Sequence, residues 1–179
     1  MTISENSDPN EEQKDKMTDG PDTRNAVTIE RTFDAPVPLI WQMWTDPEHF
    51  ANWYGPAGAA MPVARMDVQV GGTRLICMQV TGPSGPMQRW FTGEYLEVIE
   101  HQRLVYTESM SNEDGDIIAP ADVGLPPGHP ATTEVRVEFD DLGGRTRVVL
   151  THLGIPAGSP GALGWAMAMD KLAALLDQH

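Results

Sequence analysis

SPGALGWAMAMDKLAALLDQ, residues 159–178, is the stretch that decides the fold. Ser159 followed by Pro160 predicts a helix start, because a hydroxyl caps free backbone N–H groups and proline lacks a donor that the first helical position leaves unused. An apolar line at helical spacing then runs through Trp165, Met169, Leu172 and Leu176. Further apolar residues lie on the opposite side, so we expect this helix to be covered along most of its length. We predict that a curved antiparallel sheet from the middle of the chain covers it and leaves room for a ligand.

The body of the chain has the size and composition of one globular domain. Hydrophobic residues make up 40% of the 179 residues, so a sizeable core can form. Residues 1–25 are polar and acidic and lack aromatic side chains, so they cannot bury enough apolar surface to offset the entropy of ordering. We therefore predict a disordered acidic tail over 1–25 and a single domain over 26–179.

Charge and apolar content restrict the partners and the compartment. The formal net charge of -14 repels phosphate backbones and anionic lipid heads, so we expect no nucleic-acid partner. No apolar run reaches the roughly 20 residues of a membrane span, and the first residues contain no apolar signal-peptide core, so we expect no membrane insertion. The single cysteine, Cys77, fits a reducing compartment, and we predict a cytoplasmic protein.

The middle of the chain reads as an α+β arrangement. Turn residues and period-2 alternation predict strands over 26–33, 61–70, 73–80, 87–99, 103–110, 132–139 and 145–152. Helices over 36–44 and 47–53 follow the first strand, and a long loop over 111–130 precedes the sixth strand. These elements predict a curved antiparallel sheet of about seven strands wrapped around the long C-terminal helix, with two short helices after the first strand.

One strand leaves its inward face undecided. Gly93 lies inside the strand over 87–99, where glycine is typical of a bulge or a bend in a curved sheet. A bulge shifts the parity of a strand by one residue. Either Phe91 and Tyr95 or Trp90 and Leu96 therefore face inward.

Several short motifs occur in order along these elements. The most specific are Trp44-Thr45-Asp46-Pro47-Glu48 and Trp53-Tyr54-Gly55-Pro56, and further ones are Gly71-Gly72, Gly93 to Val98, Arg103 to Tyr106, Thr146 to His152 and Gly164-Trp165. With these motifs, residues 26–178 resemble the bacterial branch of the Hsp90 ATPase activator homologue-like (AHSA1-type) family in the SRPBCC/START/Bet v 1-like superfamily. The resemblance implies the helix-grip fold. It also implies a cavity between sheet and helix, in which family members bind different apolar molecules.

The aromatic and methionine side chains are the residues from which we expect the ligand site to be built. Methionine adapts to irregular surfaces and tryptophan presents a large apolar face with one donor, a combination that suits an apolar pocket. The predicted lining consists of Trp44, Trp53, Ile76, Met78, Trp90, Tyr95, Tyr106, Trp165, Met169 and Leu172. We predict that the protein binds a small apolar or aromatic molecule there, without catalysis and without a cofactor or metal.

An enzyme of the polyketide cyclase/aromatase type is the first alternative. His152, Tyr95 or Arg74 would then be the acid–base or orienting groups. His152 is a weak catalytic candidate, because a histidine at a strand end is more often bonded to a backbone group. The histidines show no metal-ligand spacing such as HExxH, and the chain contains no GxSxG, P-loop or GxGxxG motif.

A protein-interaction module is the second alternative. Leu163 and Met167 lie on the polar side of the last helix and would offer an apolar patch to a second copy of the chain or to a chaperone. Hsp90 ranks lower among these partners, because the eukaryotic namesake works with an additional N-terminal chaperone-binding domain where this chain has its acidic tail.

Overall fold

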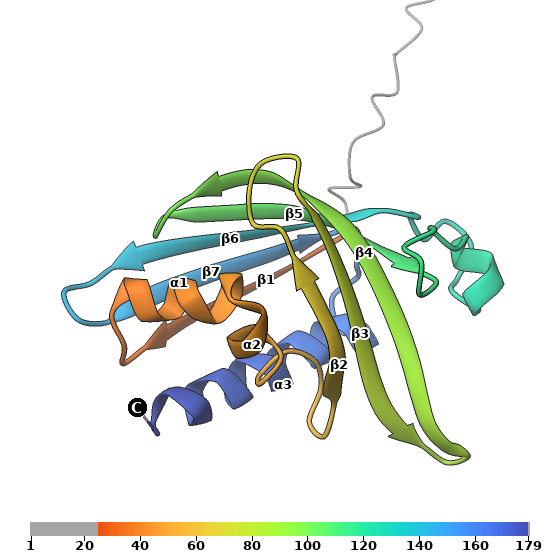
Figure 1. Ribbon diagram of the computed structural model, residues 1–179, viewed down its shortest axis with the longest axis horizontal. Helices are drawn as coiled ribbons and strands as arrows, with labels where there is room; N and C mark the ends of the chain where they lie inside the picture. Colours follow the sequence, from red (N-terminus) through yellow and green to blue (C-terminus); the bar gives the residue numbers. More distant parts are fainter. Residues whose placement is uncertain (1–24, 179) are drawn as a thin grey trace, which may run out of the picture.

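One antiparallel sheet and the helices on its concave side make up the part of the chain that the computed structural model describes, residues 25–178 (Figure 1). The predicted tail over 1–25 lies outside the described residues apart from Asn25. The strands are β1 (Ala26–Phe33), β2 (Ala60–Met66), β3 (Thr73–Gly82), β4 (Gly85–Ile99), β5 (Arg103–Ser111), β6 (Thr133–Asp141) and β7 (Thr146–Leu153). The helices are α1 (Val37–Thr45), α2 (Pro47–Phe50), the short 3₁₀ helix η1 (Pro120–Val123) and α3 (Pro160–Leu176).

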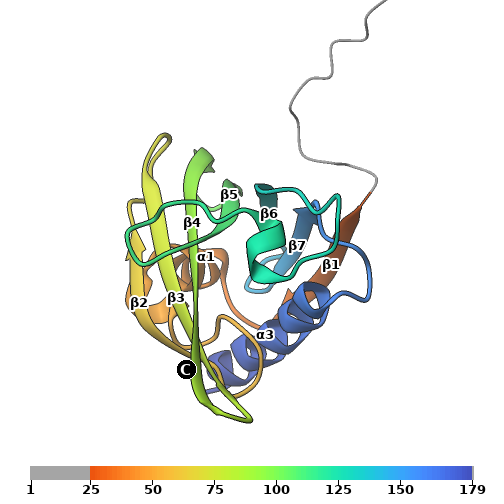
Figure 2. The same ribbon diagram turned by 90° about the vertical axis from the view of Figure 1, so that its right-hand side faces the viewer.

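The sheet has the order β1-β7-β6-β5-β4-β3-β2 and arches over α1, α2 and α3 (Figures 1 and 2). From β2 to β7, each strand pairs with the next one along the chain. The first strand, β1, lies at the edge of the sheet beside the last strand, β7. The predicted α+β helix-grip architecture, with seven strands and two short helices after the first, is confirmed. Among residues 25–178, no helix is both long and apolar enough to cross a bilayer.

The predicted terminal helix is confirmed in its start and in its buried face. Ser159 Oγ accepts a hydrogen bond from the backbone N–H of Ala162 at 3.3 Å, so the hydroxyl caps α3. The buried residues of α3 are Trp165, Ala168, Met169, Leu172 and Leu176. This face packs into one core with the inward residues of the sheet, and each large side chain buried in this way contributes about 1.5–3 kcal/mol.

The structure resolves the parity of the long strand in favour of Phe91 and Tyr95. Tyr95 is fully buried, whereas Leu96 is 43% exposed. The register of β4 with β5 shifts between Tyr95 and Glu97, so the extra residue lies after Tyr95. The alternation of inward and outward side chains is therefore unbroken from Phe91 to Tyr95. A Cβ at Gly93 would lie 1.9 Å from the carbonyl oxygen of Thr107, so the glycine permits a close approach of two backbones.

The predicted strand over 61–70 is too long, because β2 ends at Met66. The chain then turns back. The Gly71 N–H donates to the Tyr95 carbonyl at 2.8 Å, and the Tyr95 N–H donates to the Gly72 carbonyl at 2.9 Å. These bonds satisfy the backbone of Tyr95 on the β3 side of β4, one residue beyond the Thr73–Glu94 pair, so the turn occupies the place of the end of the predicted strand.

Candidate functional site

A cavity of about 640 Å³ lies between the sheet and the first half of α3. The strands β3, β4 and β5 contribute apolar side chains to it, namely Met78, Val80, Phe91 and Met110. The start of α3 contributes Gly161, Gly164, Trp165 and Ala168, and the turn after α2 contributes Tyr54, Gly55, Pro56 and Ala57. The lining is therefore largely apolar, as is usual for pockets that bind small molecules.

The β5–β6 loop (residues 112–132) forms one wall of this cavity through Ile118, Pro120, Leu125 and Pro126. Figure 2 shows this segment crossing in front of the sheet above the start of α3. The side chain of Asn112 accepts hydrogen bonds from the N–H groups of Asp114 and Asp116, and the Ile118 N–H donates to the Met110 carbonyl at 2.9 Å. The loop is therefore tied to the end of β5, and its apolar residues are held against the cavity.

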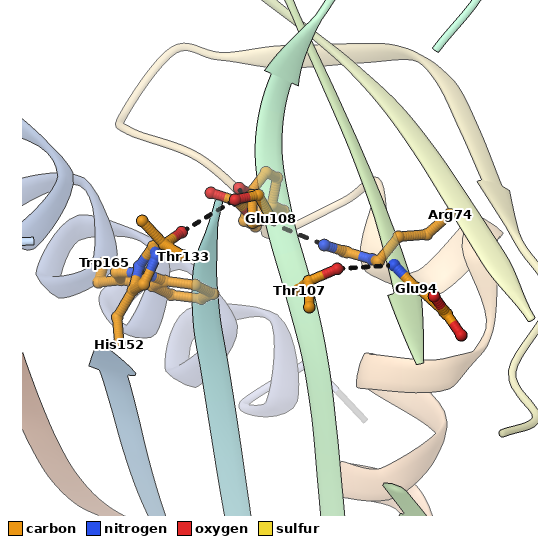
Figure 3. Close-up of polar contacts among 8 residues, drawn as sticks. Arg74, Glu94, Thr107, Glu108, Thr133, His152 and Trp165 are labelled. Carbon is orange, nitrogen blue, oxygen red and sulfur yellow. Dashed lines mark hydrogen bonds and ion pairs between the residues drawn. The ribbon is translucent and has the colours of Figure 1, made fainter. Parts of the chain in front are cut away.

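Glu108 of β5 is the acidic side chain that lines the cavity, and 11% of it is exposed (Figure 3). The Tyr54 hydroxyl donates to its Oε2 at 3.3 Å, and Nη1 of Arg74 lies 3.7 Å from the same oxygen. Burial, followed by the charge of Glu108, raises the pKa of Tyr54 well above its ordinary value. The phenol therefore keeps its proton and donates.

Arg74 lies beneath Glu108, with 2% of its surface exposed. Its guanidinium carbon is 3.9 Å from the ring centroid of Tyr106, a cation–π contact. Burial acts to lower the pKa of Arg74, but Tyr106, Tyr95 and Glu108 outweigh it and the pKa rises, so the side chain stays charged. Its Nε and Nη2 have no hydrogen-bond partner within residues 25–178. Glu108 and the face of Tyr106 therefore carry most of the compensation for this buried charge.

His152 joins the end of β7 to α3 and to β6. The Trp165 indole donates to Nδ1 at 2.9 Å, and the Thr133 hydroxyl lies 2.8 Å from Nε2. Thr133 donates to the Glu108 carbonyl oxygen at 3.1 Å, so it accepts from Nε2, which carries the proton. Burial lowers the pKa of His152, which keeps the imidazole neutral. Of the two interpretations of this histidine, the structure favours a bonded strand-end residue, although its partners are side chains.

The three groups proposed for an aromatase do not offer free acid–base atoms to the cavity. His152 lines it, but both of its nitrogens are engaged. Tyr95 and Arg74 are buried below the lining. Within the described part of the chain, no group of three His, Cys, Asp or Glu side chains is arranged to hold a metal ion.

The structure places the predicted ligand-binding residues in three different environments. Met78 and Trp165 line the cavity. The residues of the core beyond it are Trp44, Trp53, Ile76, Tyr95, Tyr106, Met169 and Leu172, all 5% exposed or less. Trp90 is half-buried and points to the other side of β4 from Phe91. Most of the predicted aromatic set therefore packs in the core next to the cavity.

Sequence reasoning did not identify Glu108 or Tyr54 as parts of the lining, and it left open whether the loop over 111–130 is a lid of the cavity. A signal existed for Glu108, because alternation from buried Leu104 and Tyr106 places it on the inward face of β5. An inward carboxylate requires a partner, and Arg74 has the matching inward parity with Ile76 on β3.

Comparisons with known proteins agree with this architecture. Residues 34–177 match the model of the family described as Activator of Hsp90 ATPase homolog 1-like protein. No curated protein matches the chain.

Many solved structures share the fold. A protein from Chromobacterium violaceum has 25% identity and a TM-score of 0.69, covering 86% of this chain and 98% of its own. A protein from Mycobacterium smegmatis has 24% identity and a TM-score of 0.67, covering 88% of this chain and 94% of its own. The AHSA1 protein from Silicibacter pomeroyi has 20% identity and a TM-score of 0.64, covering 86% of this chain and 99% of its own.

Proposed function

This chain belongs to the Activator of Hsp90 ATPase homolog 1-like family, and from the cavity of that fold we propose that it binds a small apolar or aromatic molecule between the sheet and α3. The observation that supports the proposal is the largely apolar hollow of about 640 Å³, bounded by α3, strands β3 to β7 and the β5–β6 loop. An empty apolar hollow loses the packing contacts that a ligand supplies. The proposed activity is binding without a chemical step.

The size of the hollow is sufficient for useful affinity. Burying about 200 Å² of ligand apolar surface contributes on the order of 5 kcal/mol before the costs of association. The lining comes from segments distant in the sequence, such as Met78, Ile118 and Trp165. A molecule that fills the space therefore contacts several elements at once, which favours compact ligands with a continuous apolar surface.

An NMR titration with lipids, flavonoids and polyketide-like aromatics tests this function. We expect shifts to cluster on the Trp165 indole N–H, on the Met78 methyl group and on the β5–β6 loop. Shifts confined to Leu163 and Met167 on the outer side of α3 would contradict the proposal and would direct attention to protein partners. These two residues are 58% and 37% exposed and do not line the cavity.

A variant that fills the cavity gives the matched control. Gly164 lines the cavity, and a Cβ built there meets no other atom within 4 Å. Gly164→Phe should reduce the affinity for every ligand of the panel at least tenfold while leaving the helix intact. Ala166→Phe places the same side chain on the exposed side of α3 and should retain affinity. Equal effects of the two substitutions would contradict binding in this cavity.

A further inference from the structure

Four polar side chains that line the cavity near Glu108, namely Tyr54, Thr133, His152 and Trp165, have their donors in use. Tyr54 donates to Glu108 Oε2, and Thr133 donates to the Glu108 carbonyl oxygen. His152 Nε2 donates to Thr133, and the Trp165 indole donates to His152 (Figure 3). Each of these groups has one hydrogen to donate, and each hydrogen has an acceptor inside the protein.

The unpaired Nε and Nη2 of Arg74 are buried below the lining, so the unused hydrogen-bonding capacity that Glu108 and these four side chains offer to the cavity is that of an acceptor. A carboxylate has two oxygens with about four lone-pair positions. Among the hydrogen bonds of residues 25–178, the one that reaches the Glu108 carboxylate comes from Tyr54 and goes to Oε2, so Oε1 receives none. The side chain keeps 11% of its surface exposed where it lines the cavity. A ligand that reaches Glu108 therefore meets free lone pairs and no free hydrogen on the four neighbours.

The negative charge of Glu108 already has a positive partner, Arg74, on the core side of the cavity lining. Arg74 lies 3.7 Å from Oε2 and is held over the Tyr106 ring, inside the core. A ligand ammonium would add a second cation close to a carboxylate that has one. A hydroxyl, a phenol or an amide N–H brings the missing hydrogen without adding charge. A charged acceptor binds such a donor more strongly than a neutral one does.

We propose that the ligand is an apolar molecule with a neutral hydrogen-bond donor at one end, and that Oε1 of Glu108 accepts from it. This inference rests on the proposed function, since it describes what the inner end of the same cavity recognises. Glu108 determines specificity for a hydroxyl, phenol or amide terminus. The apolar walls from β3, β4 and α3 contact the body of the molecule.

Two probes with the same aromatic body test this inference on the unmodified protein. Both 1-hydroxypyrene and 1-methoxypyrene have the same pyrene body and differ by one methyl group on the oxygen, so only the first can donate. By fluorescence titration at neutral pH, we expect the hydroxyl probe to bind about tenfold more tightly, which corresponds to about 1.4 kcal/mol. Equal affinities would overturn the role of Glu108 and leave cavity binding intact. If neither probe binds, cavity binding of apolar aromatics fails and the inference fails with it.

A third probe separates neutral donors from cations. The ammonium of 1-pyrenemethylamine should bind more weakly than 1-hydroxypyrene, because Arg74 already faces Glu108. Tighter binding of the ammonium would contradict the proposal that the donor of the ligand is neutral.

Carbon-13 labelling of glutamate gives a readout that needs no substitution. The Glu108 carboxyl carbon should shift with 1-hydroxypyrene and stay unchanged with 1-methoxypyrene, and the opposite result would contradict the contact.

The double variant Arg74→Met/Glu108→Met removes both charges together, so no buried charge is left unpaired. We expect it to bind 1-methoxypyrene with unchanged affinity and to lose the preference for 1-hydroxypyrene. Retention of the tenfold preference would overturn the inference. The matched control is Arg103→Met/Glu138→Met, which removes an ion pair of β5 and β6 outside the cavity. This control should keep the preference.

Discussion

Arg74 and Glu108 are opposite charges at the boundary between the core and the cavity. Arg74 is 2% exposed and Glu108 11% exposed, and their closest atoms are 3.7 Å apart, beyond hydrogen-bonding distance. An ion pair of this kind costs desolvation of both groups, which the attraction between them offsets only in part. Removing one partner therefore has a larger effect on stability than removing both.

This asymmetry gives a prediction for the free energy of unfolding. Arg74→Met leaves the Glu108 carboxylate without its cation, and we expect a loss of about 3–5 kcal/mol in urea denaturation. The double variant Arg74→Met/Glu108→Met should recover most of that loss. If the double variant is less stable than the single one, the two side chains do not act as a pair.

His152 makes a separate prediction about pH. Burial lowers its pKa in the folded protein, so the unfolded chain takes up the proton first as pH falls below the ordinary value of 6.5. Its contribution to stability is therefore complete at higher pH and declines on acidification, by at most about 1.4 kcal/mol per pH unit. Protonation of Nδ1 would also oppose the Trp165 N–H that donates to it.

The measurement is urea denaturation at pH values between about 7.5 and 5.5. We expect the wild-type protein to lose more stability over this range than His152→Gln, in which the side chain cannot titrate. Since other groups titrate equally in both proteins, the difference between the two slopes reports His152. Equal slopes would mean that this histidine is not held neutral.

At the scale of elements, the β5–β6 loop carries a prediction about binding. Ile118 and Leu125 line the cavity, whereas their neighbours Ile117 and Val123 are 56% and 38% exposed and do not. The double variant Ile118→Ser/Leu125→Ser should weaken the binding of 1-methoxypyrene roughly tenfold, since two apolar contacts are lost. Ile117→Ser/Val123→Ser should keep the affinity. The same loss of affinity in both variants would contradict a direct contact of Ile118 and Leu125 with the ligand.

The elements were predictable from sequence because each has its own periodicity. The helical line through Trp165 and Leu172 and the alternation of β6 and β7 each report one buried face. Neither pattern tells a core residue from a cavity residue, because both kinds face inward. Tyr106 and Glu108 share an inward face, yet one is core and the other lines the cavity. That difference depends on the opposite layer, which a strand's own sequence does not contain.

At the scale of the whole molecule, the position of the hollow follows from side-chain size along α3. The half of the helix near its start lines the cavity with Trp165 and with Gly161, Gly164 and Ala168, and these three small residues leave space beside the indole. The half near its end presents Met169 and Leu172, which are 1% and 0% exposed and pack into the core. One helix therefore closes the core with its second half and bounds the cavity with its first half.

Binding in this hollow should stabilise the whole fold, because the cavity exists only when sheet, helix and loop are assembled. A ligand that binds the folded state alone stabilises it by about 1.4 kcal/mol at ten times its Kd. For a protein of this size, 1-hydroxypyrene at that concentration should raise Tm by about 3–6 °C in a thermal scan. Gly164→Phe, which fills the hollow, should show no rise at the same concentration. An equal rise in that variant would place the ligand elsewhere, and saturation by fluorescence without any rise would mean that the unfolded chain binds it as well.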